Sequence, residues 1–385
     1  MSLVRIDAAQ ATAAQAGFDA VIDVRSPAEF AHDHLPGALN WPVLDDEQRR
    51  IVGTLYKQVS PLQARKVGAA IVARNIAGHI ERWVAGQPRD WRPLVYCWRG
   101  GQRSGTLAWF LSQIGFRTAQ LQGGYKAFRA LVRGELLGAP RRLRFQVLCG
   151  RTGSAKTRLL QALAAAGAQT LDLEALAGHR GSVLGALPGN AQPSQKRFDT
   201  LCWQALRGFD AARPVYVEGE SRRIGALRVP EALIAQLREH GQCIHVELPW
   251  AQRLQLLLQE YGHFAGDAEG FCRLLDTLVE LRGGERVKAW QAQARAGQWP
   301  EVFGALMREH YDPLYERSLR SSYRQLDQAL PLALPDIGAG TLQRTALHLL
   351  QGEPQAPLPA HGAALAPAAV GIAPPRPAHE PGQAD

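Results

Sequence analysis

Cys97 stands in a sequence context that favours reactivity. It follows a short apolar run and opens a loop that holds Gly100, Gly101 and two arginines, Arg99 and Arg103. Glycines let the backbone curl, so that amide N–H groups at the start of the next helix converge on a negative charge. Such a nest, together with the arginines, should favour the thiolate over the thiol. We therefore predict that Cys97 is a nucleophile and that Arg103 acts with it.

The other four cysteines lack this context and fit buried structural roles. They are Cys149, Cys202, Cys243 and Cys272. The cysteines show no CxxC motif and no paired spacing, and no apolar leader precedes them, so we predict a reducing cytoplasm rather than secretion. No stretch of 18 apolar residues occurs, and we therefore predict no membrane span.

A second glycine-rich loop, residues 150–157, has the form of a phosphate-binding loop between a strand and a helix. Its chemistry needs backbone N–H groups that face phosphate oxygens, a lysine that meets the outer phosphate, and a hydroxyl for Mg²⁺ or phosphate. We predict these roles for Gly150 and Gly153, for Lys156 and for Thr157.

One position of this loop departs from the usual pattern. Ala155 stands where the pattern has glycine. Its methyl group is tolerated if the residue has already entered helical dihedral angles, although it narrows the loop. The prediction of phosphate binding therefore assumes helical backbone at this residue.

Two carboxylates end a third apolar run. They are Glu218 and Glu220, and in P-loop proteins an acidic residue at a neighbouring strand end holds the metal ion or its water. Arg222 and Arg223 follow as candidates for contact with substrate phosphates. A salt-bridged strand end explains the pattern equally well. A further strand and polar loop, within residues 171–182, should face the same site.

These loops need parallel sheets to position them. A chain of 385 residues predicts two domains with appendages, and the alternation of strands and helices predicts an α/β fold with parallel sheets. We expect a first parallel-sheet domain over 1–138, a linker at 139–143, a P-loop α/β domain over 144–250, a helix-rich basic region over 251–350 and a disordered Pro/Ala-rich tail over 351–385.

The net charge of +9 favours an anionic partner, with nucleic acid as the leading class, although a solvated basic surface explains it equally well. Arginines alternate with aromatic residues in the helix-rich region, which suits contact with an RNA loop. Core packing of the aromatics is an equally good interpretation. The residues are Arg282, Arg286, Lys288, Trp290, Arg295, Trp299, Tyr311, Tyr315, Arg317, Arg320, Tyr323 and Arg324.

Four motifs of the first domain resemble, in order and spacing, those of a rhodanese domain. They are residues 23–25, residues 34–40, the loop of Cys97 and residues 121–128. The resemblance implies that Cys97 carries sulfur or selenium as a persulfide or perselenide. The span from Cys97 to Arg103 is one residue longer than in most small sulfurtransferases of this fold and resembles that of related phosphatases. It leaves room for a bulkier anion and argues against plain thiosulfate chemistry.

Over residues 15–345, the succession of rhodanese-like and P-loop motifs resembles the bacterial tRNA 2-selenouridine synthase family. The resemblance implies an enzyme that replaces sulfur by selenium at C2 of the wobble (U34) 2-thiouridine. It also implies an S-geranylated intermediate made from geranyl diphosphate, with selenophosphate as the selenium donor. The implied partner is the anticodon loop of tRNA, and we expect a monomer without a tightly bound cofactor, with Mg²⁺ as a candidate ion.

On this basis, we assign diphosphate binding to Gly150, Gly153, Lys156 and Thr157, and selenium handling to Cys97 with Arg103. Alkylation turns the thiocarbonyl sulfur into a better leaving group, and a phosphate-binding loop can hold the departing diphosphate. The motifs also fit two alternatives. One is a P-loop nucleotide hydrolase or kinase with a rhodanese-like module, and the other is a plain sulfurtransferase.

Overall fold

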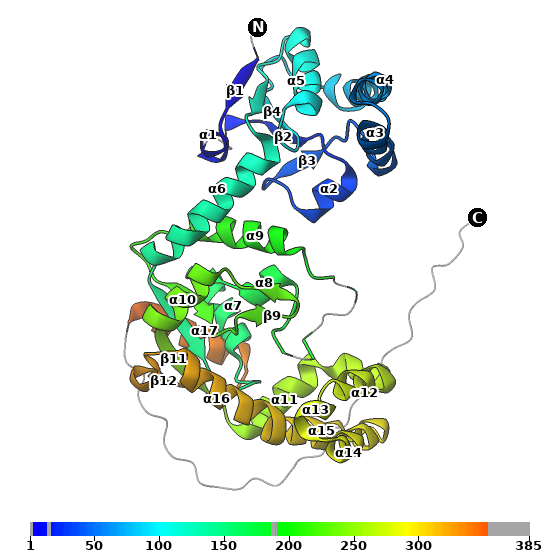
Figure 1. The fold of residues 1–385 in the computed structure, drawn as a ribbon. Helices are drawn as coiled ribbons and strands as arrows, with labels where there is room; N and C mark the ends of the chain where they lie inside the picture. The colour runs from blue at the N-terminus through cyan, green and yellow to red at the C-terminus, as the bar shows by residue number, and fades with distance from the viewer. Residues whose placement is uncertain (1–2, 14–16, 183, 186–188, 190, 353–385) are drawn as a thin grey trace, which may run out of the picture. The chain divides into compact units, whose positions relative to one another are not determined.

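The computed structural model describes residues 3–13, 17–182, 184–185, 189 and 191–352. The first sheet is wholly parallel, with strand order β1-β5-β4-β2-β3 (Figure 1). Its strands are β1 (Val4–Ile6), β2 (Ala20–Asp23), β3 (Ala38–Asn40), β4 (Pro93–Tyr96) and β5 (Ala119–Leu121). Strand β4 is buried along its whole length, as expected of a central strand covered on both faces.

Helices connect these strands in the order of a parallel α/β sheet. They are α1 (Ala8–Ala13), α2 (Pro27–His32), α3 (Asp46–Gln58), α4 (Pro61–His79), α5 (Gln102–Ile114) and α6 (Gly124–Gly138), with a π-helical turn, η2 (Ile80–Val84), after α4. Helices α3 and α4 pack against each other and lie between β3 and β4 in the chain. The predicted parallel-sheet fold of this domain is confirmed.

The predicted linker is a buried turn. Residues Ala139–Arg142 form a 3-10 turn, η3, directly after α6, and Pro140 and Leu143 are buried. One hydrophobic cluster contains side chains from both sheets and from helices, among them Phe128 of α6 and Phe198 of a later helix. The two sheets thus share a core, and the connection at 139–143 is part of it.

The second sheet is also wholly parallel, with strand order β12-β11-β6-β8-β7. Its strands are β6 (Phe145–Cys149), β7 (Gln169–Leu171), β8 (Val215–Glu218), β11 (Gln242–Glu247) and β12 (Leu330–Ala333). Helices α7 (Lys156–Ala165), α8 (Leu173–Ala177), α9 (Gln195–Arg207) and α10 (Glu231–His240) lie between them in the chain, with a small hairpin of β9 (Arg223–Ile224) and β10 (Leu227–Arg228).

The helix-rich region is an insertion in this second domain. It comprises α11 (Trp250–Glu260), η4 (Gly262–Gly266), α12 (Ala268–Asp276), α13 (Val279–Arg282), α14 (Gly284–Arg295), α15 (Trp299–Leu306), η5 (Met307–Tyr311), α16 (Asp312–Ser322) and η6 (Leu326–Gln328). The chain then returns to the sheet as β12 and packs α17 (Ala339–Gln351) against α7. The structure therefore differs from the predicted helix-rich region 251–350 in its last part, where β12 and α17 complete the P-loop domain.

The tryptophans predicted as RNA contacts lie in the core of the helical region. Trp290 and Trp299 are buried in a cluster that includes Phe271 and Phe303. Nearby arginines are also engaged within the chain, since Arg295 pairs with Glu269. Core packing is the correct interpretation of these two aromatic positions.

Most of the predicted tail, residues 353–385, lies outside the described part of the chain. Among the residues that are described, no helix is both long and apolar enough to cross a membrane.

Candidate active site

The thiol of Cys97 lies just beyond the end of β4 and is almost fully buried. Ser104, in the first turn of α5, donates a hydrogen bond from its hydroxyl to Cys97 Sγ at 3.3 Å. Gln120 Nε2 in turn donates to Ser104 Oγ and to the carbonyl of Gly101, each at 3.0 Å. The loop therefore presents a sulfur atom whose surroundings are fixed by side chains from two further elements.

The start of α6 holds this loop from the other side. The backbone N–H groups of Tyr125 and Lys126 donate to the carbonyls of Cys97 and Trp98 at 2.8 and 2.9 Å. A Cβ at Gly124, which has φ of +55°, would lie only 2.3 Å from the carbonyl oxygen of Cys97. Glycine is therefore required there by both backbone conformation and contact.

Arg103 is tied to a neighbouring helix. Its Nη1 atom donates to Glu29 Oε2 of α2 at 2.9 Å. Burial opposes ionisation of Glu29, but the hydrogen bond and charge of Arg103 hold the pKa of that carboxyl below its ordinary value. Arg103 lies in the first turn of α5, directly after the reactive loop, with its guanidinium engaged by a carboxylate.

The second loop connects β6 to α7, in the strand-loop-helix context that was predicted. Lys156 Nζ donates to the carbonyls of Gly150 and Arg151 at 2.7 and 3.2 Å. Gly153 has φ of +77°, and a Cβ there would lie 3.1 Å from the carbonyl oxygen of Arg253. The lysine ammonium thus lies against the loop that should cradle the phosphates.

The expectation for Ala155 is wrong. Its dihedral angles, φ 64° and ψ 22°, are left-handed, and Lys156 is the first residue of α7. A left-handed conformation of an L-residue costs about 1–2 kcal/mol, because Cβ approaches the following carbonyl oxygen. The loop keeps the backbone shape of the usual glycine and accepts strain to do so.

Two helices of the insertion brace this loop. Arg253 of α11 donates twice to the carbonyl of Thr152, at 3.0 and 2.8 Å, and pairs with Asp312 of α16. The hydroxyl of Tyr315 accepts a hydrogen bond from the backbone N–H of Gly150 at 2.7 Å. The phosphate-binding loop is thus held by residues about 100 and 165 positions later in the chain.

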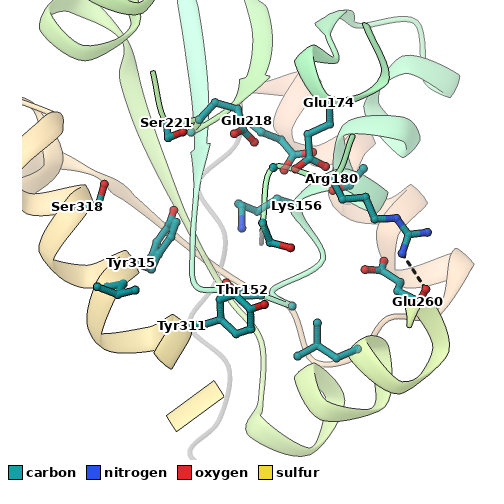
Figure 2. Close-up of a pocket in the computed structure, with 18 of the residues that line it drawn as sticks. Thr152, Lys156, Glu174, Arg180, Glu218, Ser221, Glu260, Tyr311, Tyr315 and Ser318 are labelled. Atoms are coloured by element: carbon teal, nitrogen blue, oxygen red, sulfur yellow. Dashed lines mark hydrogen bonds between the residues drawn. The ribbon is translucent and has the colours of Figure 1, made fainter. Parts of the chain in front are cut away.

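A cavity of about 890 Å³ opens beside the loop (Figure 2). It is lined by the loop, the segment around α8, the end of β8, the end of α11, and α16 with the residues that flank it. The lining includes Gly153, Lys156, Thr157, Glu218 and Glu220. Glu174, Arg180, Gly181 and Ser182 also line it, as predicted for the segment within 171–182.

Three carboxyl groups meet in this cavity. Burial and the charges of Glu218 and Glu220 raise the pKa of Glu174 to about 10. Burial also raises the pKa of Glu218 and of Glu220, and Lys156 opposes the increase in both. Glu218 accepts a hydrogen bond from Thr157, while its Oε1 atom is buried without a partner.

Other predicted residues lie outside the cavity lining. Arg222 and Arg223 are exposed on and beside the β9 strand and do not line it. Cys97 and Arg103, at the other loop and at the start of α5, do not line it either. Within the described residues, no group of three or more His, Cys, Asp or Glu side chains is placed to hold a metal ion. Glu218 and Glu220 both line the cavity, as a substrate or metal role would require.

The apolar side of the cavity was not predicted. Tyr311, Tyr315, Leu319 and Tyr323 recur at four-residue spacing along α16 and its flanks, and all four line the cavity. The tyrosines were among the candidates for RNA contact. Their spacing was the available signal, because positions four apart share one face of a helix.

Two family models match the chain. Residues 7–131 match the rhodanese-like domain, and residues 143–271 match the tRNA 2-selenouridine synthase AAA domain. A curated protein named tRNA 2-selenouridine synthase from Alcanivorax borkumensis is 34% identical over 332 residues, which cover 78% of this chain and 89% of that protein. A protein of the same name from Verminephrobacter eiseniae is 34% identical over 364 residues, which cover 83% and 95%.

Solved structures also resemble the chain. A rhodanese-related protein from Thermoplasma volcanium is 20% identical, with a TM-score of 0.23, and the similarity covers 33% of this chain and 92% of that one.

Gly124→Ala should lower the free energy of unfolding by about 2–3 kcal/mol. The change adds left-handed strain and displaces the Cys97 carbonyl from its hydrogen bond. Urea denaturation measures the effect. The matched control is Gly134→Ala on the exposed face of the same helix, where no atom lies within 4 Å of the new Cβ. Equal effects of the two changes would contradict the constraint at Gly124.

Ala155→Gly should raise the free energy of unfolding by about 0.5–1 kcal/mol, because relief of left-handed strain exceeds the added entropy of the unfolded chain. Ala164→Gly, within α7, should lower it by a similar amount. A loss of stability in both variants, measured by urea denaturation, would show that Ala155 is not strained.

Proposed function

This chain belongs to the tRNA 2-selenouridine synthase family, and we propose that it converts wobble 2-thiouridine of tRNA to 2-selenouridine in two steps. The first step is geranylation of the sulfur by geranyl diphosphate, and the second is selenation with selenophosphate. The observation that carries the proposal is the 34% identity to a synthase over 89% of that protein's length. The similarity spans both the thiol loop and the phosphate-binding loop.

The cavity supports the first step through its two kinds of lining. Lys156, Thr157 and the loop amides offer an anion cradle at the start of α7. Leu257, Leu314 and Leu319 supply apolar surface to the same cavity. A prenyl diphosphate has the same two parts, an anion and a hydrocarbon chain, and its apolar part would be removed from water on binding.

Chemistry explains why alkylation should come first. A thiocarbonyl sulfur is a poor leaving group, whereas an alkylated sulfur leaves as a thiol and makes C2 electrophilic. Lys156 and the loop amides would stabilise the charge that grows on the departing diphosphate. Mg²⁺ is a proposed companion of the diphosphate, and the hydroxyl of Thr157 is the group that the loop would offer to it.

The loop of Cys97 supports the second step. Its thiol is held by Ser104 beside the amides and glycines that precede α5. We assign to Cys97 the handling of selenophosphate during selenation, and to Arg103 the support of this loop through Glu29. The selenium atom of selenophosphate would attack C2, the C2–S bond would break and geranylthiol would leave. Water would then cleave the P–Se bond, releasing phosphate and 2-selenouridine. The two loops supply separate chemistry, since no residue of the Cys97 loop lines the cavity.

Nucleotide hydrolysis is the second candidate function. The phosphate-binding loop and the neighbouring acidic strand end favour it. Turnover of ATP or GTP by the purified chain without tRNA would distinguish this function from the synthase. A plain sulfurtransferase would instead transfer sulfur to cyanide and would leave the cavity without a task.

Cys97→Ala should abolish selenation and let geranylated tRNA accumulate, because the group that handles selenophosphate is lost while the cavity is intact. Mass spectrometry of wobble nucleosides measures both products after incubation with geranyl diphosphate and selenophosphate. Cys272→Ala, at a buried cysteine of the helical core, is the control and should keep both activities. Selenation by the Cys97 variant would refute the assignment.

Lys156→Ala should reduce geranylation at least about 100-fold, since one charged group that stabilises the departing diphosphate is removed. The same variant should still selenate tRNA that has been geranylated beforehand. Lys196→Ala, an exposed lysine of α9, serves as the control. An unchanged geranylation rate in the Lys156 variant would remove the diphosphate role from this loop.

A further inference from the structure

A carboxyl pair lies on one side of the cavity. The side chains of Glu174, in α8, and Glu220, just beyond β8, are joined by a hydrogen bond. The backbone of Gly181 packs closely over them, since a Cβ there would lie 2.6 Å from Glu174 Oε1 and 3.2 Å from Glu220 Oε2. Two carboxyl groups this close cannot both be ionised at little cost, so one of them keeps its proton.

A third carboxyl group makes the site incomplete as it stands. Glu218 is about 95% buried, and its Oε1 atom has no hydrogen-bond partner. Figure 2 shows Glu174 and Glu218 on the same side of the cavity, with Lys156 between them and Thr152. A buried oxygen without a partner costs about 1–3 kcal/mol, which indicates that this side of the cavity receives a hydrogen-bond donor from a ligand.

The surrounding charges divide the pair into a donor and an acceptor. Burial raises the pKa of Glu174 to about 10, so that this carboxyl is protonated at neutral pH. Burial also raises the pKa of Glu220, while Lys156, the Ser221 backbone and the Glu174 hydrogen bond lower it.

The groups that face the pair come from several elements. In addition to Lys156 and Ser221, these groups are Asp172 and Arg180 around α8, Glu218 at the end of β8, Glu260 of α11, and Tyr315 and Tyr323 of α16 and its flank. The result is a carboxylate, Glu220, that receives a hydrogen bond from Glu174 and has an increased affinity for a proton.

S-alkylation of 2-thiouridine requires such an acceptor. The neutral base carries a proton on N3, and the S-alkylated product has a C2=N3 double bond and no N3 proton. Without a base, the alkylated ring would bear a positive charge. This step rests on the proposed function, in which the cavity binds geranyl diphosphate and the wobble base reaches it.

We propose that Glu220 is the general base of the alkylation step and that Glu174 is its positioning residue. The sulfur attacks C1 of geranyl diphosphate, so that the C–S bond forms and the C1–O bond breaks. The electron pair of that bond leaves with diphosphate. The electron pair of the N3–H bond forms the C2=N3 bond, and the proton moves to the Glu220 carboxylate, which later releases it to water.

Glu220 is the best placed of the three carboxyls for this role. Glu174 holds its own proton and cannot accept another. Glu218 is more deeply buried and is hydrogen-bonded to Thr157 of the phosphate-binding loop. Glu220 is partly exposed and lines the cavity, and the hydrogen bond from Glu174 lowers its pKa against the increase caused by burial.

Glu220→Gln should reduce the rate of geranylation of 2-thiouridine tRNA about 100-fold at pH 7, within the usual effect of a general base. The difference in rate between the wild type and the variant should shrink to a few-fold or less at a pH at which thiouridine loses its N3 proton to water or hydroxide. This rescue by high pH is the decisive readout, because a structural defect would persist at every pH. Glu239→Gln, at an exposed glutamate of α10, is the matched control.

A pair of variants at Glu174 tests its positioning role. Glu174→Ala removes the hydrogen bond that lowers the pKa of Glu220, so the acidic limb of the pH-rate profile should move to higher pH. Glu174→Gln retains an N–H donor and should keep the limb near its wild-type position. Profiles that coincide for all three proteins would refute the role of Glu174.

Further outcomes separate this inference from the proposed function. If the wild-type chain makes no geranylated tRNA, the proposed function fails and the inference with it. If the wild type does and Glu220→Gln matches it at pH 7, only the inference fails. A Glu220→Gln protein that loses stabilisation by inorganic diphosphate in thermal unfolding, or regains its rate with added Mg²⁺, would show a ligand- or cation-binding role and would also overturn the proposal.

Discussion

The charge of Lys156 is the interaction on which the cavity depends. Its ammonium lowers the pKa of Glu174, Glu218 and Glu220, which would otherwise face one another in a region of low dielectric. A diphosphate bound at the loop would engage the same ammonium and bring further negative charge. The carboxyl groups should then bind protons more tightly, so that diphosphate binding and the proton affinity of the carboxyl groups are linked. An enzyme that must take a proton from its substrate during the same step gains from this linkage.

The helical insertion supports the phosphate-binding loop of the same cavity. The insertion lies between β11 and β12 in the chain. Its residues Arg253 and Tyr315 contact the phosphate-binding loop, and Asp312 pairs with Arg253. The loop needs this support, because Ala155 adopts a left-handed conformation that alanine disfavours. Packing from distant residues can offset such local strain. Residues that could have formed a separate RNA-binding module instead serve as wall and brace of the cavity, with Trp290 and Trp299 in their core.

The sequence predicts those parts of the site in which a few adjacent residues determine both backbone and chemistry. The Cys97 loop, the loop from Gly150 to Thr157 and the strand end at Glu218 are of this kind, and so is the fold of two parallel sheets. What could not be predicted depends on packing between distant segments. Strand β12 is only four residues long and contains a proline, so that pairing with β11 defines it. The apolar side of the cavity on α16 and the dihedral angles of Ala155 also depend on packing between distant segments.

Two loops in one chain place a requirement on the substrate. No residue of the Cys97 loop lines the cavity, so under the proposed function the wobble base must visit both. An intermediate that moves between sites has to be covalently stable, and loss of the N3 proton supplies that stability by leaving the alkylated base neutral. The base then becomes reactive again only where a selenium nucleophile meets C2. Under the proposed function, proton removal in the cavity would therefore do more than speed alkylation, because it would also let the two steps occur at separate places.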